Sequence, residues 1–359
     1  MYKRQGPDVS GRTGFAQRVR AGVDVLVDIT GSGDPTAIDV APDGSVIVAL
    51  GGNDDISLGK EDDFSFRPVR GAGSGSYEYG DEENENPKAV TNVLRRPVAI
   101  RFSPDGKFAY TANMFGDSVS VIDIGKRELT ANISLGARPK DVSLVDRGEE
   151  FFFDARLSHD GWMSCHSCHT DGHTNGQLND NLSDGGFGAS KRILSLLGQK
   201  ETAPYAWSGK VADLKTQVHN SLEKTMLERT PPTEEQLEAL TAFISQLPLP
   251  PSVDELRDVS LDRQAIERGK EVFAKRDCGR CHAGDNFTSK ESFDVGLADE
   301  LGNRKFNPPS LRGLSHRGPF LHDNRAATLA EVFSKHKHPD GEGLTPEQIA
   351  DLVSYLKGL

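Results

Sequence analysis

Several features common in membrane, secreted or nucleic-acid-binding proteins are scarce in this chain of 359 residues. Only four cysteines and four methionines are present, and no stretch approaches the roughly 18 consecutive apolar residues that suggest a transmembrane helix. The 54 acidic residues outnumber the 42 Lys and Arg, and the formal net charge of −12 argues against a nucleic-acid partner. The length allows two or three domains, each with its own hydrophobic core.

All four cysteines belong to two Cys-x-x-Cys-His motifs. Covalent haem attachment needs two thiols about one helical turn apart and a histidine directly after the second thiol to bind the iron. A thiol redox pair or a zinc site also uses closely spaced cysteines, but neither explains a histidine after both pairs. We therefore predict two covalently bound haem c groups. Their attachment residues and proximal ligands are Cys165, Cys168 and His169 for the first haem and Cys278, Cys281 and His282 for the second.

The N-terminal part of the chain carries a repeated β pattern. Residues 35–49 and 97–111 each contain a short alternating strand, a Pro-Asp-Gly turn and a second strand. Two more alternating segments follow the second copy, and Pro97 recurs as Pro139 after 42 residues, a length that suits one four-stranded propeller blade. The pattern resembles the YVTN-type β-propeller repeat. We expect residues 6–138 to form a partial, N-terminally truncated all-β propeller.

One segment interrupts this repeat. Residues from about 54 to 94 are rich in glycine, serine and acidic side chains. Such a composition cannot bury enough apolar surface to order itself, so we predict a solvated insertion. A calcium site among its acidic residues is the alternative.

The beginning of the chain shows no signal peptide. Residues 1–5 resemble the translation of a sequencing adapter, so we expect the natural N-terminus, together with any signal, to be missing. Because c-type haem is normally attached outside the cytoplasm, we expect a periplasmic or extracellular protein.

From about residue 139 the hydrophobic period becomes helical and the sequence is internally duplicated. An Arg-Gly pair at 147–148 and another at 268–269 each lead into one haem motif. Each copy ends in an amphipathic helix, over 233–247 and 345–359, whose first residue is a threonine N-cap. The duplication predicts two mainly α domains, which cover residues 139–250 and 251–359.

Each of these units resembles a cytochrome c domain, and the tandem resembles the bacterial di-haem cytochrome c peroxidase and MauG superfamily. Residues 307–313, Asn-Pro-Pro-Ser-Leu-Arg-Gly, and 318–323, Gly-Pro-Phe-Leu-His-Asp, are similar to the second-domain signature of that family. The resemblance covers about 140–359 and implies a peroxidase that reduces hydrogen peroxide with electrons from a small cytochrome or cupredoxin. MauG-like oxidation of a protein side chain and pure electron transfer are the alternatives. We expect the chemistry to lie wholly in residues 140–359, with the sheet region used for docking.

The sixth iron ligand decides between electron transfer and peroxide chemistry. In a cytochrome c domain it comes from the loop before the C-terminal helix, where Met226 and His338 each lie seven residues before a threonine N-cap. We predict Met226 for the first haem, with core packing as the alternative, and His338 for the second, with His336 as its competitor. The best-known peroxidases have the Met-ligated haem in the second domain, so which haem meets peroxide stays open.

Only two tryptophans occur in the chain, and both lie in the first haem unit. Trp162 lies just before the first motif, three residues from Cys165, and Trp207 lies in the middle of the unit. Both are candidates for an electron path between the haems, with packing in the core or haem pocket as the alternative. The sequence does not identify a catalytic proton-transfer residue.

Overall fold

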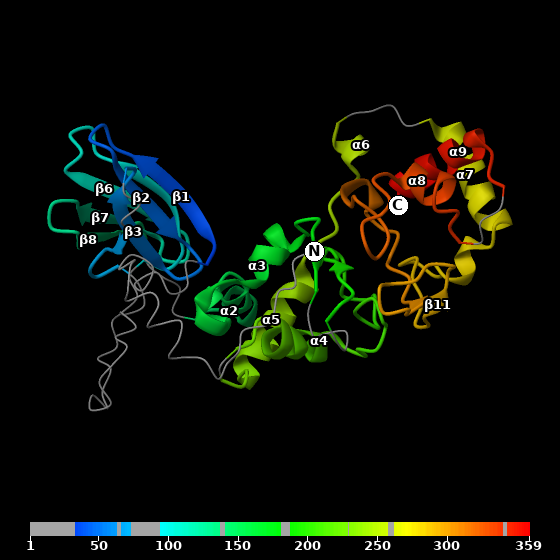
Figure 1. The fold of residues 1–359 in the computed structure, drawn as a ribbon, viewed down its shortest axis with the longest axis horizontal. Coiled ribbons are helices and arrows are strands. Elements are labelled where there is room, and N and C mark those ends of the chain that lie inside the picture. Colours follow the sequence, from blue (N-terminus) through cyan, green and yellow to red (C-terminus); the bar gives the residue numbers. More distant parts are fainter. Residues whose placement is uncertain are drawn as a thin grey trace. The chain divides into compact units, whose positions relative to one another are not determined.

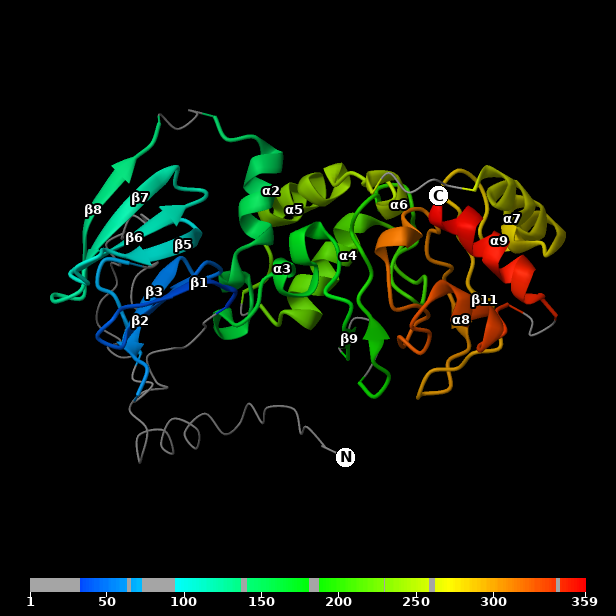
Figure 2. The same cartoon turned by 90° about the horizontal axis from the view of Figure 1, so that it is seen from above.

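The structure, a computed structural model, describes residues 33–62, 66–72, 94–136, 141–180, 187–228, 230–257, 262–339 and 343–359 (Figures 1 and 2). The chain divides into two compact units. Unit 1 comprises the chain up to Asp141 together with residues 153–164, and unit 2 comprises Val142–Phe152 and Cys165–Leu359. No helix within the described ranges is long and apolar enough to cross a membrane.

Unit 1 contains two four-stranded antiparallel sheets, ordered β1-β2-β3-β4 and β5-β6-β7-β8. The strands predicted in both repeats and after the second repeat are confirmed. Burial alternates along 108–113 and 118–123, which place one face in the core, whereas 45–50 is buried on both faces. That core includes Ile47, Ile56, Leu94 and Ile122, all fully buried. The strands are β1 (Pro35–Val40), β2 (Ser45–Leu50), β3 (Asp55–Lys60), β4 (Arg67–Pro68), β5 (Pro97–Phe102), β6 (Phe108–Asn113), β7 (Ser118–Asp123) and β8 (Glu128–Ser134).

Hydrogen bonds join the two sheets at and beside their first strands. Asp39 of β1 accepts from the Phe102 amide at 2.8 Å, and Asp34 accepts from the Arg96 guanidinium at 2.8 Å. The described strands nevertheless form two separate sheets and do not close into a ring. The N-terminal part is therefore a sheet-rich region, and the expected propeller is not confirmed.

The prediction of a solvated insertion from residue 54 is wrong at its beginning. Residues 55–60 form β3, whose Ile56 and Leu58 are buried, and 67–68 form β4. The apolar residues alternate with polar ones within an acid-rich run, and pairing with β2 outweighs the local composition. Most of the rest of the predicted insertion, residues 73–93, lies outside the described residues, and with it most of the acidic segment considered for calcium.

Unit 2 contains two helical domains of the same plan. In the first, α2 (Leu144–Phe152) packs against α5 (Glu234–Gln246), and in the second, α7 (Arg263–Lys275) packs against α9 (Pro346–Lys357), as Figure 2 shows. The remaining helices and short strand pairs are α3 (Cys165–Cys168), η4 (Thr170–Gly172), β9 (Leu178–Asn179), β10 (Lys191–Arg192), α4 (Leu214–Asn220), the π-helical turn η6 (Ser221–Thr225), α6 (Val253–Leu256), η7 (Cys278–Arg280), β11 (Phe293–Asp294), β12 (Lys305–Phe306), η8 (Leu314–His316) and α8 (Leu329–Ser334).

The duplicated Arg-Gly pairs explain why the two helix crossings are alike. A Cβ atom on Gly148 would lie 2.0 Å from the Ala239 carbonyl oxygen, and one on Gly269 would lie 2.1 Å from that of Asp351. Only glycine lets the helix backbones approach this closely. Both predicted C-terminal helices are confirmed, and each begins with a capping box formed by its threonine and a glutamine three residues later.

Residues 153–164 connect α2 to the first haem motif but belong to unit 1. The Ala155 amide donates to the Gly52 carbonyl at 2.8 Å, and Asn53 donates its side-chain amide to the Gly161 carbonyl at 3.1 Å. The guanidinium of Arg156 lies 3.2 Å from the carboxylate of Asp54. The predicted single boundary near residue 139 therefore misses this segment, because its partners are far away in the sequence.

Candidate haem centres

The first Cys-x-x-Cys-His motif forms one helical turn. Cys165 and Cys168 are the first and last residues of α3, and the His169 amide donates to the Cys165 carbonyl at 2.9 Å. Nδ1 of His169 lies 3.3 Å from the carbonyl oxygen of His173. A proton on Nδ1 donates to that oxygen and leaves the lone pair of Nε2 available to a metal. None of the four cysteines forms a disulfide.

Met226 lies beside this first motif. Its side chain is 3 % exposed, and its Sδ atom is 4.0 Å from Sγ of Cys165. The residue follows η6, in which α4 continues as one π-helical turn, and its amide donates to the Ser221 carbonyl at 2.8 Å. A π-helical turn re-aims the side chains that follow it and is frequent at functional sites. The structure thus brings the predicted ligand next to the first pair of thiols.

The second motif repeats this arrangement. The His282 amide donates to the Cys278 carbonyl at 3.0 Å, and Nδ1 of His282 lies 3.1 Å from the Phe287 carbonyl oxygen. Burial lowers the pKa of both motif histidines, that of His169 to about 4. Both rings are therefore neutral at neutral pH, which is the form that binds metals.

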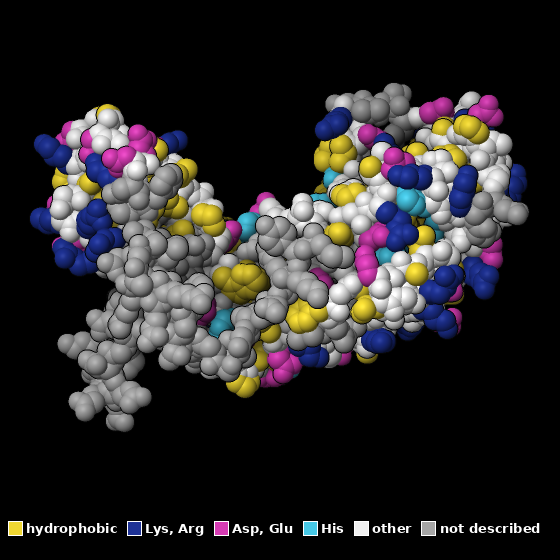
Figure 3. Space-filling model, in the orientation of Figure 1, with side chains coloured by type: hydrophobic (Ala, Val, Ile, Leu, Met, Phe, Trp, Pro, Cys, Tyr) yellow, Lys and Arg dark blue, Asp and Glu magenta, His cyan; other side chains and the backbone are white. Residues whose placement is uncertain are grey.

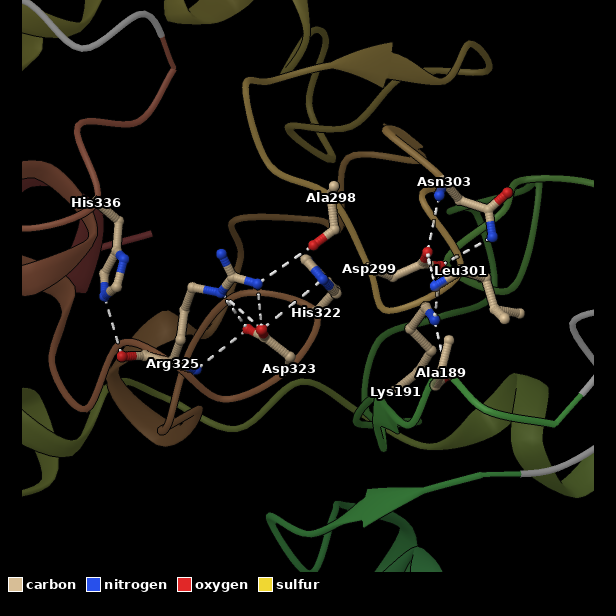
Figure 4. A network of polar contacts seen from close by, with 10 residues as sticks. All are labelled: Ala189, Lys191, Ala298, Asp299, Leu301, Asn303, His322, Asp323, Arg325 and His336. Atoms are coloured by element: carbon tan, nitrogen blue, oxygen red, sulfur yellow. Dashed lines mark hydrogen bonds and ion pairs between the residues drawn. The ribbon is translucent and has the colours of Figure 1, made fainter.

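His338 faces the second motif histidine. The ring centres of His338 and His282 lie 6.4 Å apart, with an angle of 66° between the ring planes. A nitrogen ligand at about 2 Å from a metal has its imidazole centre about 3 Å away, so two rings on opposite sides of one metal lie about 6 Å apart. Nε2 of His336 instead lies 3.0 Å from the Arg325 carbonyl oxygen (Figure 4). His282 and His338 would therefore be spaced to hold one haem iron between them.

Trp207 lies where the two helical domains of unit 2 meet. It is 8 % exposed, and its indole nitrogen donates to the Arg192 carbonyl at 2.8 Å. Its ring is edge-on to His322, which occupies the matching position 115 residues later, at a centroid distance of 6.3 Å. The ring of His322 stacks on Phe306 at 4.3 Å. Trp162, the other sequence candidate, belongs to unit 1 and is 58 % exposed.

This placement predicts an effect of Trp207 on electron transfer between the haems. Trp207→Phe removes the indole and its hydrogen bond to Arg192, and we expect electron transfer to slow about tenfold, equivalent to roughly 1.4 kcal/mol in the barrier. Stopped-flow reduction, followed at wavelengths specific for each haem, measures this rate. Trp162→Phe is the matched control and is expected to leave the rate unchanged. Equal rates in both variants and the wild type would exclude Trp207 from the path.

A buried ion pair joins the same two domains (Figure 4). Nζ of Lys191 lies 3.0 Å from the Asp299 carboxylate, whose side chain is 1 % exposed. Asn303 donates to both oxygens of this carboxylate, from its amide at 2.8 Å and its side chain at 2.9 Å. Burial alone raises the pKa of Asp299, but the hydrogen bonds from Asn303 and Lys191 outweigh burial and lower it to about 2.

The lowered pKa of Asp299 predicts a pH-dependent stability. A carboxyl whose folded pKa is below its unfolded value of about 3.9 stabilises the fold fully above that value and loses this contribution as the pH falls towards 2. We expect the stability advantage of the wild type over Asp299→Asn to shrink by about 2 kcal/mol over this window. Chemical denaturation at several pH values measures it. Asp294→Asn, at an exposed pair with Arg304, is the control, and an equal change there would contradict the assignment.

Comparison with known proteins agrees with this geometry. Residues 143–248 match the family model described as di-haem cytochrome c peroxidase, and 266–359 match that of cytochrome c. The chain thus carries a domain of the di-haem cytochrome c peroxidase family, followed by a cytochrome c domain. The protein is therefore a haem c oxidoreductase related to MauG and to cytochrome c551 peroxidase. The named resemblance and the haem c cofactor predicted from the two motifs are confirmed at the level of the family.

Several known proteins are similar to the chain over much of their length. Hydrazine synthase subunit gamma of Kuenenia stuttgartiensis is 28% identical to this chain, over 62% of this chain and 79% of its own length. A solved structure of hydrazine synthase from the same organism superposes with a TM-score of 0.54 at 25% identity. That superposition covers 62% of this chain and 89% of the other. MauG of Methylorubrum extorquens is 26% identical over 74% of this chain and 96% of its own. Cytochrome c551 peroxidase of Nitrosomonas europaea is 24% identical, over 62% and 81%.

Two features of this site, a pair of buried arginines and a buried ion pair, were not predicted from the sequence. Arg192 and Arg317 are buried near the domain boundary, and Lys191 pairs with Asp299 across it. These residues lie in irregular segments and two-residue strands, whose periodicity carries no burial signal. Within the described residues, no group of three or more His, Cys, Asp or Glu side chains is placed to hold a further metal ion.

Proposed function

We propose that this protein reduces hydrogen peroxide with electrons from a small cytochrome or cupredoxin, and that peroxide reacts at the second haem. The two Cys-x-x-Cys-His motifs would hold the haems through Cys165, Cys168, Cys278 and Cys281. His169 and Met226 would ligate the first iron, and His282 and His338 the second. The observation that carries the proposal is a difference in burial: Met226 is 3 % exposed, whereas His338 is only half-buried.

Met226 is a firmly held ligand. Its side chain is almost fully buried beside Cys165, and the helix and π turn before it fix its backbone. A thioether ligand raises the reduction potential of a haem relative to a second histidine. The first haem site therefore suits the storage of an electron from the donor.

His338 is less firmly enclosed. It is half-buried in the short segment between α8 and α9, and its neighbours Lys335 and Lys337 are exposed. Departure of His338 from the second iron would open a coordination position to peroxide, the chemistry that a haem with an open sixth position supplies. Trp207, between the two helical domains, provides a route for the stored electron.

The donor would approach an electrically mixed surface. Figure 3 shows Lys and Arg side chains spread over the visible face of the second haem domain. Charges on such a surface make the rate of association with a charged redox protein sensitive to salt. Because covalent haem is attached outside the cytoplasm, we place the protein in the periplasm or the cell exterior. Exposed basic residues of this domain include Arg268, Lys275, Lys290, Arg304 and Lys305.

A peroxide-consumption assay on the haem-loaded protein tests the proposal. We expect turnover once one electron has entered the protein, with kcat/KM at or above about 10⁴ M⁻¹ s⁻¹, the lower range of ordinary enzymes. No consumption in the oxidised, half-reduced or reduced protein would contradict the proposal and favour a di-haem cytochrome for electron transfer alone. Consumption that requires a protein substrate, with no turnover of a small donor, would favour MauG-like oxidation.

A further inference from the structure

Two buried arginines meet where the helical domains of unit 2 join. Arg192 on β10 is 5 % exposed, and Arg317, directly after η8, is 6 % exposed. Burial lowers the pKa of Arg192 to about 10, and burial together with the charges of Arg192 and Arg312 lowers that of Arg317 to about 10. Both guanidinium groups therefore remain charged at neutral pH, close enough to repel one another.

The described residues do not supply the anion that such a pair needs. Arg317 donates to the carbonyl oxygens of Ser310 at 3.1 Å and Leu197 at 3.2 Å. Nε and one terminal nitrogen of Arg192 are buried without a hydrogen-bond partner, and its guanidinium carbon lies 5.9 Å from the centre of the Phe320 ring. No carboxylate among the described residues forms an ion pair with either group. A buried charge without a partner is costly, so the arrangement points to a bound anion.

The arginine pair lies between the two haem sites. Arg192 is two residues before Leu194, whose carbonyl interacts with the His169 ring. Ser310, which binds Arg317, directly follows Pro309, whose carbonyl interacts with the His282 ring. The contacts also cross the domain boundary in both directions, because Arg317 reaches Leu197 and the Arg192 amide donates to the His322 carbonyl.

We propose that Arg192 and Arg317 form a shared carboxylate site between the two haem domains, and that haem propionates occupy it. The inference rests on the proposed haem sites. Each haem carries two propionates, and a guanidinium binds a carboxylate through two parallel hydrogen bonds. Propionates in this place satisfy the unpaired nitrogens of Arg192 and bring one cation from each domain to the edge of the haems.

The proposal has a consequence for the reduction potentials. Positive charge near a haem favours the reduced iron, and the interaction is strong at a buried site because screening by water and salt is weak. Arg192→Gln and Arg317→Gln should therefore each lower the midpoint potential of at least one haem. Arg192→Lys keeps the charge but loses the bidentate geometry of the guanidinium. The haem midpoint potential should therefore fall less in this variant than in Arg192→Gln.

Spectroelectrochemical titration of the haem-loaded variants measures both potentials. Arg304→Gln is the matched control, since Arg304 is exposed and pairs with Asp294, and it should leave both potentials unchanged. Redox-difference infrared spectra of protein carrying haem labelled with ¹³C at the propionate carboxyl groups identify the anion. We expect a carboxylate band that shifts with the label and is altered in Arg192→Gln and Arg317→Gln.

Two results would overturn the proposal. The first is unchanged potentials in both glutamine variants that have loaded two haems. The second is a carboxylate band that responds to the arginine substitutions but not to the label, because a protein carboxylate or another anion would then fill the site. Neither the redox titration nor the infrared measurement requires peroxide turnover. Both therefore test the arginine site even if the peroxidase proposal fails.

Discussion

Replacing His338 by alanine is expected to convert the second haem from a six-coordinate, low-spin state to a high-spin state open to peroxide. The reason is geometric, since His338 is the ring opposite His282 at 6.4 Å. If its departure is the step that admits peroxide, the variant no longer needs prior reduction. Peroxide turnover by the fully oxidised protein should rise by at least about tenfold, the effect of roughly 1.4 kcal/mol on the barrier. Electron paramagnetic resonance and the peroxide assay check the two parts separately.

The neighbouring histidine provides a matched control for this prediction. Nε2 of His336 bonds to the Arg325 carbonyl, so His336→Ala should leave the second haem low-spin. A high-spin haem in His336→Ala and a low-spin haem in His338→Ala would reverse the assignment. A high-spin haem in His338→Ala without any reaction with peroxide would show that the second site serves electron transfer.

The first haem carries its own spectroscopic test. A thioether ligand gives ferric haem c a weak absorption band near 695 nm, an expectation from cytochrome c chemistry. Met226→Ala should abolish this band and lower the potential of the first haem, while the second haem keeps its spectrum. A band that persists in Met226→Ala, or that is absent from the wild type, would contradict the assignment of Met226.

The parts of the site that follow from local covalent chemistry were predictable from the sequence. The thiol and histidine spacing of each motif is imposed by haem attachment, and it corresponds to one turn at α3 and at η7. Equal distances from Met226 and His338 to the threonine caps follow from the duplication, and the structure brings both side chains to the predicted motifs. Capping boxes and strand alternation could be predicted for the same reason, since each depends on residues only a few positions apart.

What depends on packing between distant segments was not predictable. Burial of Arg192 and Arg317 arises only when the two helical domains meet, and neither residue has a neighbour in sequence that signals it. Strand β3 was hidden by the acidic residues around it, although Ile56 and Leu58 carried the alternation. The segment 153–164 looked like a connector within the haem region because its partners, Gly52, Asn53 and Asp54, are about a hundred residues earlier.

This segment changes the expected result of removing residues 1–138. Chemistry confined to 140–359 would leave both haems intact, but residues 153–164 end directly before Cys165 and lose their partners in such a variant. Phe153, which is 8 % exposed and lies beneath the Arg96 guanidinium and beside Phe115, would become exposed, at about 2 kcal/mol. A domain is stabilised by only about 5–15 kcal/mol, so this loss is large enough to disorder residues 153–164, which lead into the first haem motif. The first haem should lose its 695 nm band, whereas the second haem should keep its spectrum.

A point variant tests the same dependence in the full chain. A Cβ atom on Gly52 would lie 2.7 Å from the Gly33 carbonyl oxygen and 2.9 Å from Cβ of Ala155, so Gly52→Val displaces the segment before Cys165. Gly136→Val is the control, because no atom of the described residues lies within 4 Å of a Cβ atom there. We expect Gly52→Val, but not Gly136→Val, to weaken the 695 nm band and lower the melting temperature of the first haem domain. An unchanged band in both Gly52→Val and the deletion variant would show that the haem region is self-sufficient, and that the sheets serve docking alone.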